Sequence, residues 1–124
     1  IDVTGTKFKN IQDKAVSVGE NSTMTATQLL IETVGVGVVS KDSSRISMAD
    51  SVIREFQTAA MMAYKKKKQY GPATIFAKNI KVQNLPASAL AQKGSRIFIN
   101  EEALPTLDLN IKNLYATTMK PGLK

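Results

Sequence analysis

The densest group of side chains that could do chemistry is the run Lys65–Lys68, flanked by Tyr64 and Tyr70. Consecutive ammonium groups can neutralise an anionic polymer, and a tyrosine ring can stack on a sugar ring. The chain carries 17 Lys and Arg against 10 Asp and Glu, a net charge of +7, and this run supplies four of the positive charges. We therefore expect a binding site for an anionic polysaccharide or cell-wall polymer, made by Tyr64, Lys65, Lys66, Lys67, Lys68 and Tyr70.

Two other interpretations of the lysine run stay open. A solvated loop also uses lysines, because exposed charge keeps a sheet surface soluble and discourages pairing between sheet edges. Nucleic acid is also attracted to lysines, but the sequence has no second basic stripe, no glycine-rich phosphate loop and no known nucleic-acid-reading module. We therefore do not expect nucleic acid as a partner.

The acidic residues offer two candidate sites. Glu20 and Asp42 are 22 positions apart and, with Asn21, could supply oxygen ligands to calcium. A solvated turn uses the same residue types, and the neighbouring Lys41 opposes a cation. Glu101–Glu102 could be a glycosidase pair, but adjacent side chains point in different directions, which favours a surface loop. We therefore predict no catalytic residue, no metal site and no cofactor.

Several absences narrow the chemistry further. The chain has no cysteine and no histidine, which excludes a disulfide framework, a thiol nucleophile and an imidazole base. The longest apolar run, Leu29–Val39, is too short for a bilayer and contains Glu32, so we expect no membrane span. A chain that begins with Ile1 rather than Met is expected to have been processed or excised.

Apolar residues recur along the chain at a spacing of about 22 positions. Residues 23–44 placed above residues 45–64 pair Met24 with Ile46 and Val38 with Ala60. The next copy keeps the register if seven extra residues are allowed at about 65–71, and one residue is gained or lost near Gly35. Four ladders result: Ile1, Met24, Ile46, Ile75, Ile97; Val3, Ala26, Met48, Ala77, Ile99; Phe8, Ile31, Ile53, Val82, Leu104; and Ile11, Val34, Phe56, Leu85, Leu107.

The first two ladders are two positions apart, which is the period of a β-strand. Copies made of short strands and polar turns such as Asn21–Ser22 predict stacked coils of a parallel β-helix, an all-β solenoid of about five coils. Residues 47–68 alone also fit a helix, since Ala, Met and Lys favour one. Because the matching copies are rich in Thr, Val and Gly or alternate as strands do, we predict strand there as well.

Three phrases carry a family resemblance: KFKNIQDKAVSVGENSTMTA (7–26), GVGVVSKDSSRISM (35–48) and AYKKKKQYGPATIFAKNIKV (63–82). They resemble coils of right-handed parallel β-helix proteins, the pectin-lyase-like superfold, and are similar to bacterial segments that accompany spore-coat protein H-type or lamin-tail-type domains. The resemblance covers about residues 1–100. After Asn100 the pattern departs, and Pro105 interrupts the coil. We expect a single domain or fragment over 1–124, with regular coils over about 1–100 and an irregular fifth coil or cap over about 101–124.

The resemblance implies a right-handed solenoid and leaves two functions open. One is a noncatalytic structural or adhesive module, secreted or at the cell surface, that binds an anionic glycan through the basic loop. The other is a fragment of a carbohydrate-active enzyme, a polysaccharide lyase or glycoside hydrolase, whose catalytic half lies outside this chain. Flanking domains or self-association are expected partners at open solenoid ends, because unpaired coils invite pairing.

Overall fold

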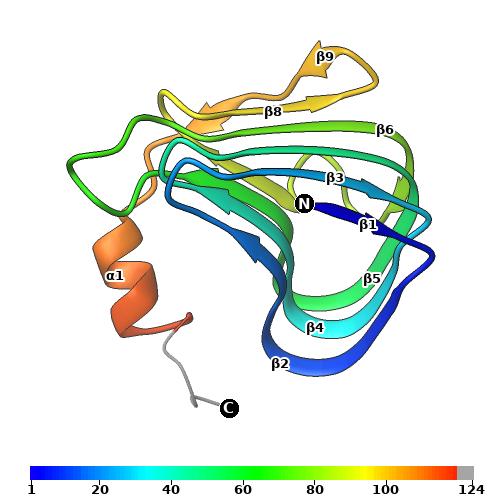
Figure 1. Cartoon of the computed structure of the whole chain (residues 1–124). Coiled ribbons are helices and arrows are strands. Elements are labelled where there is room, and N and C mark those ends of the chain that lie inside the picture. The colour runs from blue at the N-terminus through cyan, green and yellow to red at the C-terminus, as the bar shows by residue number, and fades with distance from the viewer. Residues whose placement is uncertain (120–124) are drawn as a thin grey trace.

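Figure 1 shows a computed structural model of the chain, which describes residues 1–119. Most of these residues lie in strands, which confirms the expected all-β class, and one short helix follows them. The elements are β1 (Asp2–Thr4), β2 (Lys7–Val18), β3 (Thr23–Thr27), β4 (Leu30–Lys41), β5 (Arg45–Tyr64), β6 (Thr74–Val82), β7 (Ala89–Gln92), β8 (Arg96–Ile99), β9 (Glu102–Ala103), β10 (Thr106–Leu107) and α1 (Ile111–Ala116). No helix within residues 1–119 has the length and apolar character needed to cross a membrane.

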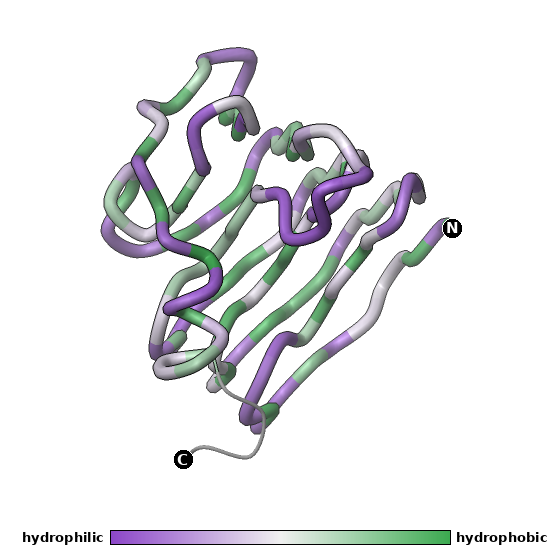
Figure 2. The backbone as a smooth tube through the Cα atoms, turned by 90° about the vertical axis from the view of Figure 1, so that its left-hand side faces the viewer, coloured by the Kyte–Doolittle hydropathy of each residue, from purple (hydrophilic) through white to green (hydrophobic). Residues whose placement is uncertain are grey.

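The strands form two parallel runs that share β5. One run has the order β1-β3-β5-β6-β8, and the other pairs β2 with β4 and β4 with β5. Each pass of the chain therefore lies beside the previous one, as Figure 2 shows from the side. The pair β8 and β9 is antiparallel, so the sheet is mixed.

Three of the predicted ladders are confirmed over most of their length. The paired residues are Met24, Ile46, Ile75 and Ile97 in the first; Val3, Ala26, Met48, Ala77 and Ile99 in the second; and Phe8, Ile31, Ile53 and Val82 in the third. Their central members are buried, because alternate side chains of each strand point inward and stack on the equivalent side chains of the next pass.

Two predicted pairings are wrong. Val38 lies opposite Met61 rather than Ala60, because the β4–β5 register shifts between Val34 and Val36. Leu107 pairs with Gln92 and is 44% exposed, so it does not continue an inner ladder. The chain has reversed into the antiparallel β9 before this point, and an offset read from parallel passes no longer applies. The last residues of the predicted cap, 120–124, lie outside the described residues.

The chain turns its corners at residues with left-handed backbone angles. One row consists of Gln28, Asp50 and Asn79, with φ of 55°, 53° and 49°. A second row consists of Asn10, Thr33, Glu55 and Asn84, with φ of 58°, 58°, 56° and 62°. Asn and Asp tolerate this region better than most residues, since their short polar side chains can bond locally. The corner residues therefore recur at the same sequence offsets as the residues of the inner ladders.

From Val34 onward, the strand β4 is buried on both faces. Its inward side chains join the main core, while Val36 and Val39 point the other way, into a second cluster with Met62 and Tyr64 of β5. Ile111 of α1 packs on this second cluster, so the helix covers the outer face of β4 and β5. A strand that is buried on both sides has a nearly continuous apolar sequence, and residues 34–39 have such a sequence.

The strand β5 continues to Tyr64, which confirms strand rather than helix for residues 47–64. The chain then leaves the sheet and rejoins it at Thr74, opposite Arg45. That offset of 29 positions is seven more than the 22 between Thr23 and Arg45, so the predicted insertion at 65–71 is confirmed.

Candidate functional site

The predicted lysines lie in the loop of residues 65–71, the lysine loop, which a buried carboxylate holds from below. Oδ1 of Asp42 accepts hydrogen bonds from the backbone N–H groups of Lys66, at 2.7 Å, and Lys67, at 2.8 Å. Asp42 is completely buried, and its Oδ2 has no hydrogen-bond partner within residues 1–119. Hydrogen bonds to a charged acceptor are among the stronger ones, so this contact fixes the backbone of the loop.

Further contacts hold both ends of the lysine loop. The N–H of Lys65 donates to Oε1 of Gln92 at 2.8 Å, and the N–H of Gly71 donates to Oγ of Ser43 at 2.5 Å. The N–H of Ser43 in turn donates to the carbonyl of Gly71 at 2.9 Å. The polar turn before β5, residues 42–44, therefore serves as the support on which the loop is built, and this explains its polar composition.

The four lysines differ in their partners. All are exposed, but Lys67 forms an ion pair with Glu20, whose hydrogen bond raises the pKa of the Lys67 ammonium group. Among the described residues, Lys65, Lys66 and Lys68 form no ion pair with an acid. Three ammonium groups on a fixed backbone therefore remain available to an external anion.

The two predicted tyrosines are placed differently. Tyr64 is completely buried, and its hydroxyl lies 2.5 Å from the hydroxyl of Tyr115. Burial, together with this hydrogen bond, raises the pKa of Tyr64. The expectation that Tyr64 stacks on a ligand ring is therefore wrong, because its ring lies under α1 in the second apolar cluster. Tyr70 lies within the loop and is half-buried.

Tyr115 of α1 is a site residue that sequence reasoning missed. The ammonium group of Lys66 lies 4.0 Å from the centre of its ring, and that of Lys14 lies 5.0 Å from it. The Lys14 side chain is only 10% exposed and pairs with Asp13 at 3.2 Å, so it holds the ring rather than facing solvent. No local pattern could have linked Tyr115 to the loop, because the two meet only through the packing of α1 on β5.

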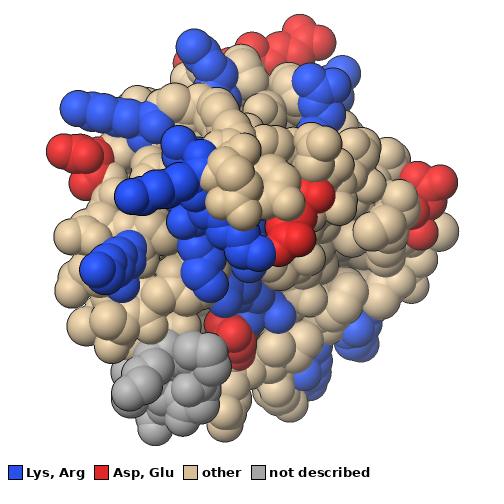
Figure 3. Space-filling view, turned by 60° about the vertical axis from the view of Figure 1, so that its left-hand side comes forward, with Lys and Arg blue, Asp and Glu red and all other residues tan. Residues whose placement is uncertain are grey.

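Positive side chains gather on the face that carries the lysine loop and α1, with acidic side chains beside this group (Figure 3). Side chains from three parts of the sequence meet there: Lys14 of β2, the loop, and Tyr115 of α1. This surface can attract an anion through charge and can hold it against a backbone that does not need to be ordered first.

The acids predicted as alternative sites have other partners. Glu20 and Asp42 lie in neighbouring turns, which the hydrogen bond from the N–H of Asn21 to the carbonyl of Asp42 joins at 2.8 Å. Lys67 forms an ion pair with Glu20, and the loop amides bond to Asp42. No group of three or more acidic residues within residues 1–119 is arranged to hold a metal ion. Glu101 and Glu102 are exposed, and Glu101 lies 3.7 Å from the ammonium group of Lys78, as a surface position would.

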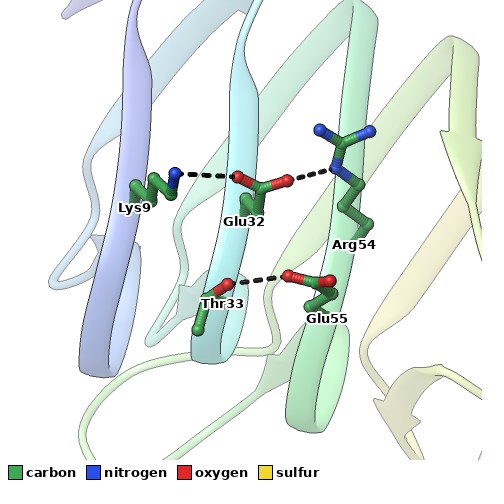
Figure 4. Close-up of polar contacts among 5 residues, drawn as sticks. All are labelled: Lys9, Glu32, Thr33, Arg54 and Glu55. Carbon is green, nitrogen blue, oxygen red and sulfur yellow. Dashed lines mark hydrogen bonds and ion pairs between the residues drawn. The ribbon is translucent and has the colours of Figure 1, made fainter.

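A ladder of charged side chains crosses β2, β4 and β5 (Figure 4). Glu32 stands between Lys9, at 3.7 Å, and Arg54, at 2.6 Å. The hydrogen bond from Arg54 lowers the pKa of Glu32, which therefore acts as an ion-pair partner rather than a proton acceptor. One position along, Oγ1 of Thr33 donates to Oε2 of Glu55 at 2.8 Å. These contacts support the stacking of the three strands.

The assignment of the site rests on its geometry alone. No protein-family model, no curated protein and no solved structure matches the chain. The candidate site thus consists of the lysine loop, the buried Asp42 that anchors it, and the ring of Tyr115 beside it.

Proposed function

We propose that this chain is a noncatalytic module of a secreted or cell-surface protein that binds an anionic glycan or cell-wall polymer through the lysine loop. We also propose that its strands wind as a right-handed parallel β-helix of about five coils. The parallel pairs at offsets of 22, 23 and 29 positions support this winding, as does the resemblance to pectin-lyase-like coils. Such a scaffold is rigid and can present one loop without rearrangement.

The observation that carries the binding proposal is the burial of Asp42 beneath the loop. A solvated loop needs no buried charge beneath it, and burying a carboxylate is costly unless the fold uses it. Here the carboxylate fixes the amides of Lys66 and Lys67, while the ammonium groups of Lys65 and Lys68 stay exposed and without an acidic partner among the described residues. A loop that is ordered in advance loses less conformational entropy when it binds.

A glycan array that includes polyuronates and neutral polysaccharides tests this proposal. We expect the wild-type chain to bind the polyuronates, and the triple variant Lys65→Ser, Lys66→Ser and Lys68→Ser to lose that binding. Lys67 is left in place because its ion pair with Glu20 supports the loop. The matched control carries Lys7→Ser, Lys9→Ser and Lys81→Ser, which removes the same charge from exposed strand positions.

Equal loss of binding in the two triple variants would show that only net charge matters, and it would refute the loop as the site. A reducing-end assay on the same polyuronates separates the module from the enzyme. Product formation that an acidic substitution abolishes would overturn the noncatalytic proposal and favour the carbohydrate-active alternative.

A further inference from the structure

The outward face of the run β1-β3-β5-β6-β8 has an unusual composition. Inward side chains alternate with outward ones along these strands, and most outward positions near the N-terminus carry small hydroxyl residues. Phe76 and Phe98, however, occupy neighbouring outward positions, and their rings are stacked with centres 5.0 Å apart and planes 7° apart. Both are half-buried although they face away from the core. Aromatic rings on a solvent-facing sheet surface are candidates for contact with a ligand.

A groove of about 390 Å³ lies beside this aromatic pair. Its walls include three hydroxyl side chains, one small apolar residue, one ring and one cation: Thr25, Thr27, Ser47, Ala49, Phe76 and Lys78. The groove exists because small side chains on β3 and β5 stand next to a large ring on β6, where Ser47 pairs with Phe76. It combines an apolar wall with a few hydrogen-bonding groups, as sites for small ligands do.

Arg45 does not line this groove but lies next to it, over the Phe76 ring that forms one wall. Its guanidinium carbon lies 5.2 Å from the centre of the Phe76 ring. Within residues 1–119 it forms no ion pair with an acid. A guanidinium group held against an aromatic ring keeps its N–H edge free, and that planar edge matches a carboxylate with two parallel hydrogen bonds. Among the described residues, Lys78 on the groove wall pairs only with the exposed Glu101, at 3.7 Å.

We propose that this groove binds one carboxylated sugar ring. The carboxylate pairs with Arg45, the C–H face of the ring packs beside Phe76, and the sugar hydroxyls bond to Thr25, Thr27 and Ser47. The hydroxyl groups favour a sugar over an aromatic acid, which would leave those of Thr25 and Ser47 without a partner on the ligand; Oγ1 of Thr27 already lies 2.9 Å from Oγ1 of Thr4. The ligand class rests on the proposed function, but the site shares no residue with the lysine loop.

A titration with sodium glucuronate, followed by amide chemical shifts, tests the proposal. We expect saturable shifts at residues 45–49 and 74–78, and we expect Arg45→Gln to weaken binding about tenfold or more, because the bidentate charged contact is lost. Arg96→Gln is the matched control, since Arg96 faces outward at the row of Arg45 but its guanidinium group is not the one held over Phe76. Phe76→Leu is expected to weaken binding without abolishing it, and an unchanged pattern of distant shifts verifies that this variant is folded.

Three results would overturn the proposal: no saturable shift, equal affinity in Arg45→Gln and the wild type, or benzoate bound as tightly as glucuronate. The neutral methyl ester of glucuronate is expected to bind at least about tenfold more weakly, since it cannot form the charged contact. The triple lysine-loop variant should bind glucuronate as the wild type does. If it does so while polyuronate binding is unaffected by the loop substitutions, the groove proposal stands and the loop proposal fails.

Discussion

Gly37 tests the packing of β4 against β5, on which the candidate site is built. A Cβ atom at this position would lie 2.5 Å from the carbonyl oxygen of Ala60 and 2.8 Å from Cγ2 of Ile53. Both neighbours are completely buried, and the N–H of Ala60 is bonded to the carbonyl of Ser88, so the backbone of β5 has little freedom to move away. Overpacking of a dense core costs about 1–3 kcal/mol, and contact with backbone puts Gly37→Ala at the upper end, about 3 kcal/mol.

Gly19→Ala is the matched control for this substitution. The three atoms nearest to a Cβ at Gly19 all belong to the side chain of Lys41, with Cε at 3.0 Å and Cγ at 3.1 Å, and that flexible chain can rotate away. Neither glycine has a left-handed backbone, so the two substitutions differ mainly in what surrounds them. Gly19→Ala should be neutral or stabilising by up to about 1 kcal/mol, because alanine restricts the unfolded chain.

Urea unfolding followed by circular dichroism measures this difference. We expect Gly37→Ala to shift the midpoint downward with an unchanged slope, which indicates lost stability rather than a changed transition. If Gly37→Ala is as stable as Gly19→Ala, the close approach of β4 and β5 described above is incorrect.

Three further predictions concern the polar contacts. Asp42→Ala leaves the amides of Lys66 and Lys67 without their acceptor, so we expect the free energy of unfolding to fall by about 2 kcal/mol. We also expect faster tryptic cleavage within residues 65–68. Cleavage as slow as in the wild type would contradict this role of Asp42. The pKa of Glu32 is lowered in the fold, so its ion pairs contribute stability above the ordinary carboxyl pKa of 4.5, and this stability is lost as the pH falls through the lowered pKa. The destabilisation by Glu32→Gln should therefore be largest near neutral pH and fade in acid. A destabilisation that does not depend on pH would contradict this. The pKa of Tyr64 is raised, so its neutral phenol stabilises the fold fully below pH 10, and this stabilisation is lost only as the pH rises further. A titration followed by tyrosinate absorbance should show a phase at high pH that Tyr64→Phe removes. A titration unchanged by that substitution would refute the burial of Tyr64.

The sequence allowed the inner ladders to be predicted because they depend on spacing alone. Met24, Ile46 and Ile75 pair as expected, since parallel passes of similar length keep equivalent residues in line. The loop at 65–71 was also predictable, because its extra residues interrupt that spacing. The shift near Gly35 was predicted for β2 and β4, whose register changes where Ile11 and Lys14 face Val34 and Val36. A second shift at the same place in β4, against β5, was not predicted.

The surroundings of the loop could not be predicted from spacing. The helix α1 has only six residues, which is too short for a periodic pattern, and it depends on packing against Val36, Val39 and Met62. Since that packing buries Tyr64 and brings Tyr115 to Lys66, the sequence placed the four lysines in one loop but did not indicate the ring that accompanies them. The role of Asp42 was hidden for the same reason, because a turn aspartate shows its partners only once the loop above it is in place.

The most direct test of binding by the lysine loop is to map where an anionic glycan touches the protein. Hydrogen exchange of the wild-type chain with and without sodium polygalacturonate reports protection of individual backbone segments. We predict the largest gain in protection within residues 65–71, and no such gain in the variant that lacks Lys65, Lys66 and Lys68. Protection confined to other strands, or equal protection in that variant, would contradict the assignment of the lysine loop as the binding site.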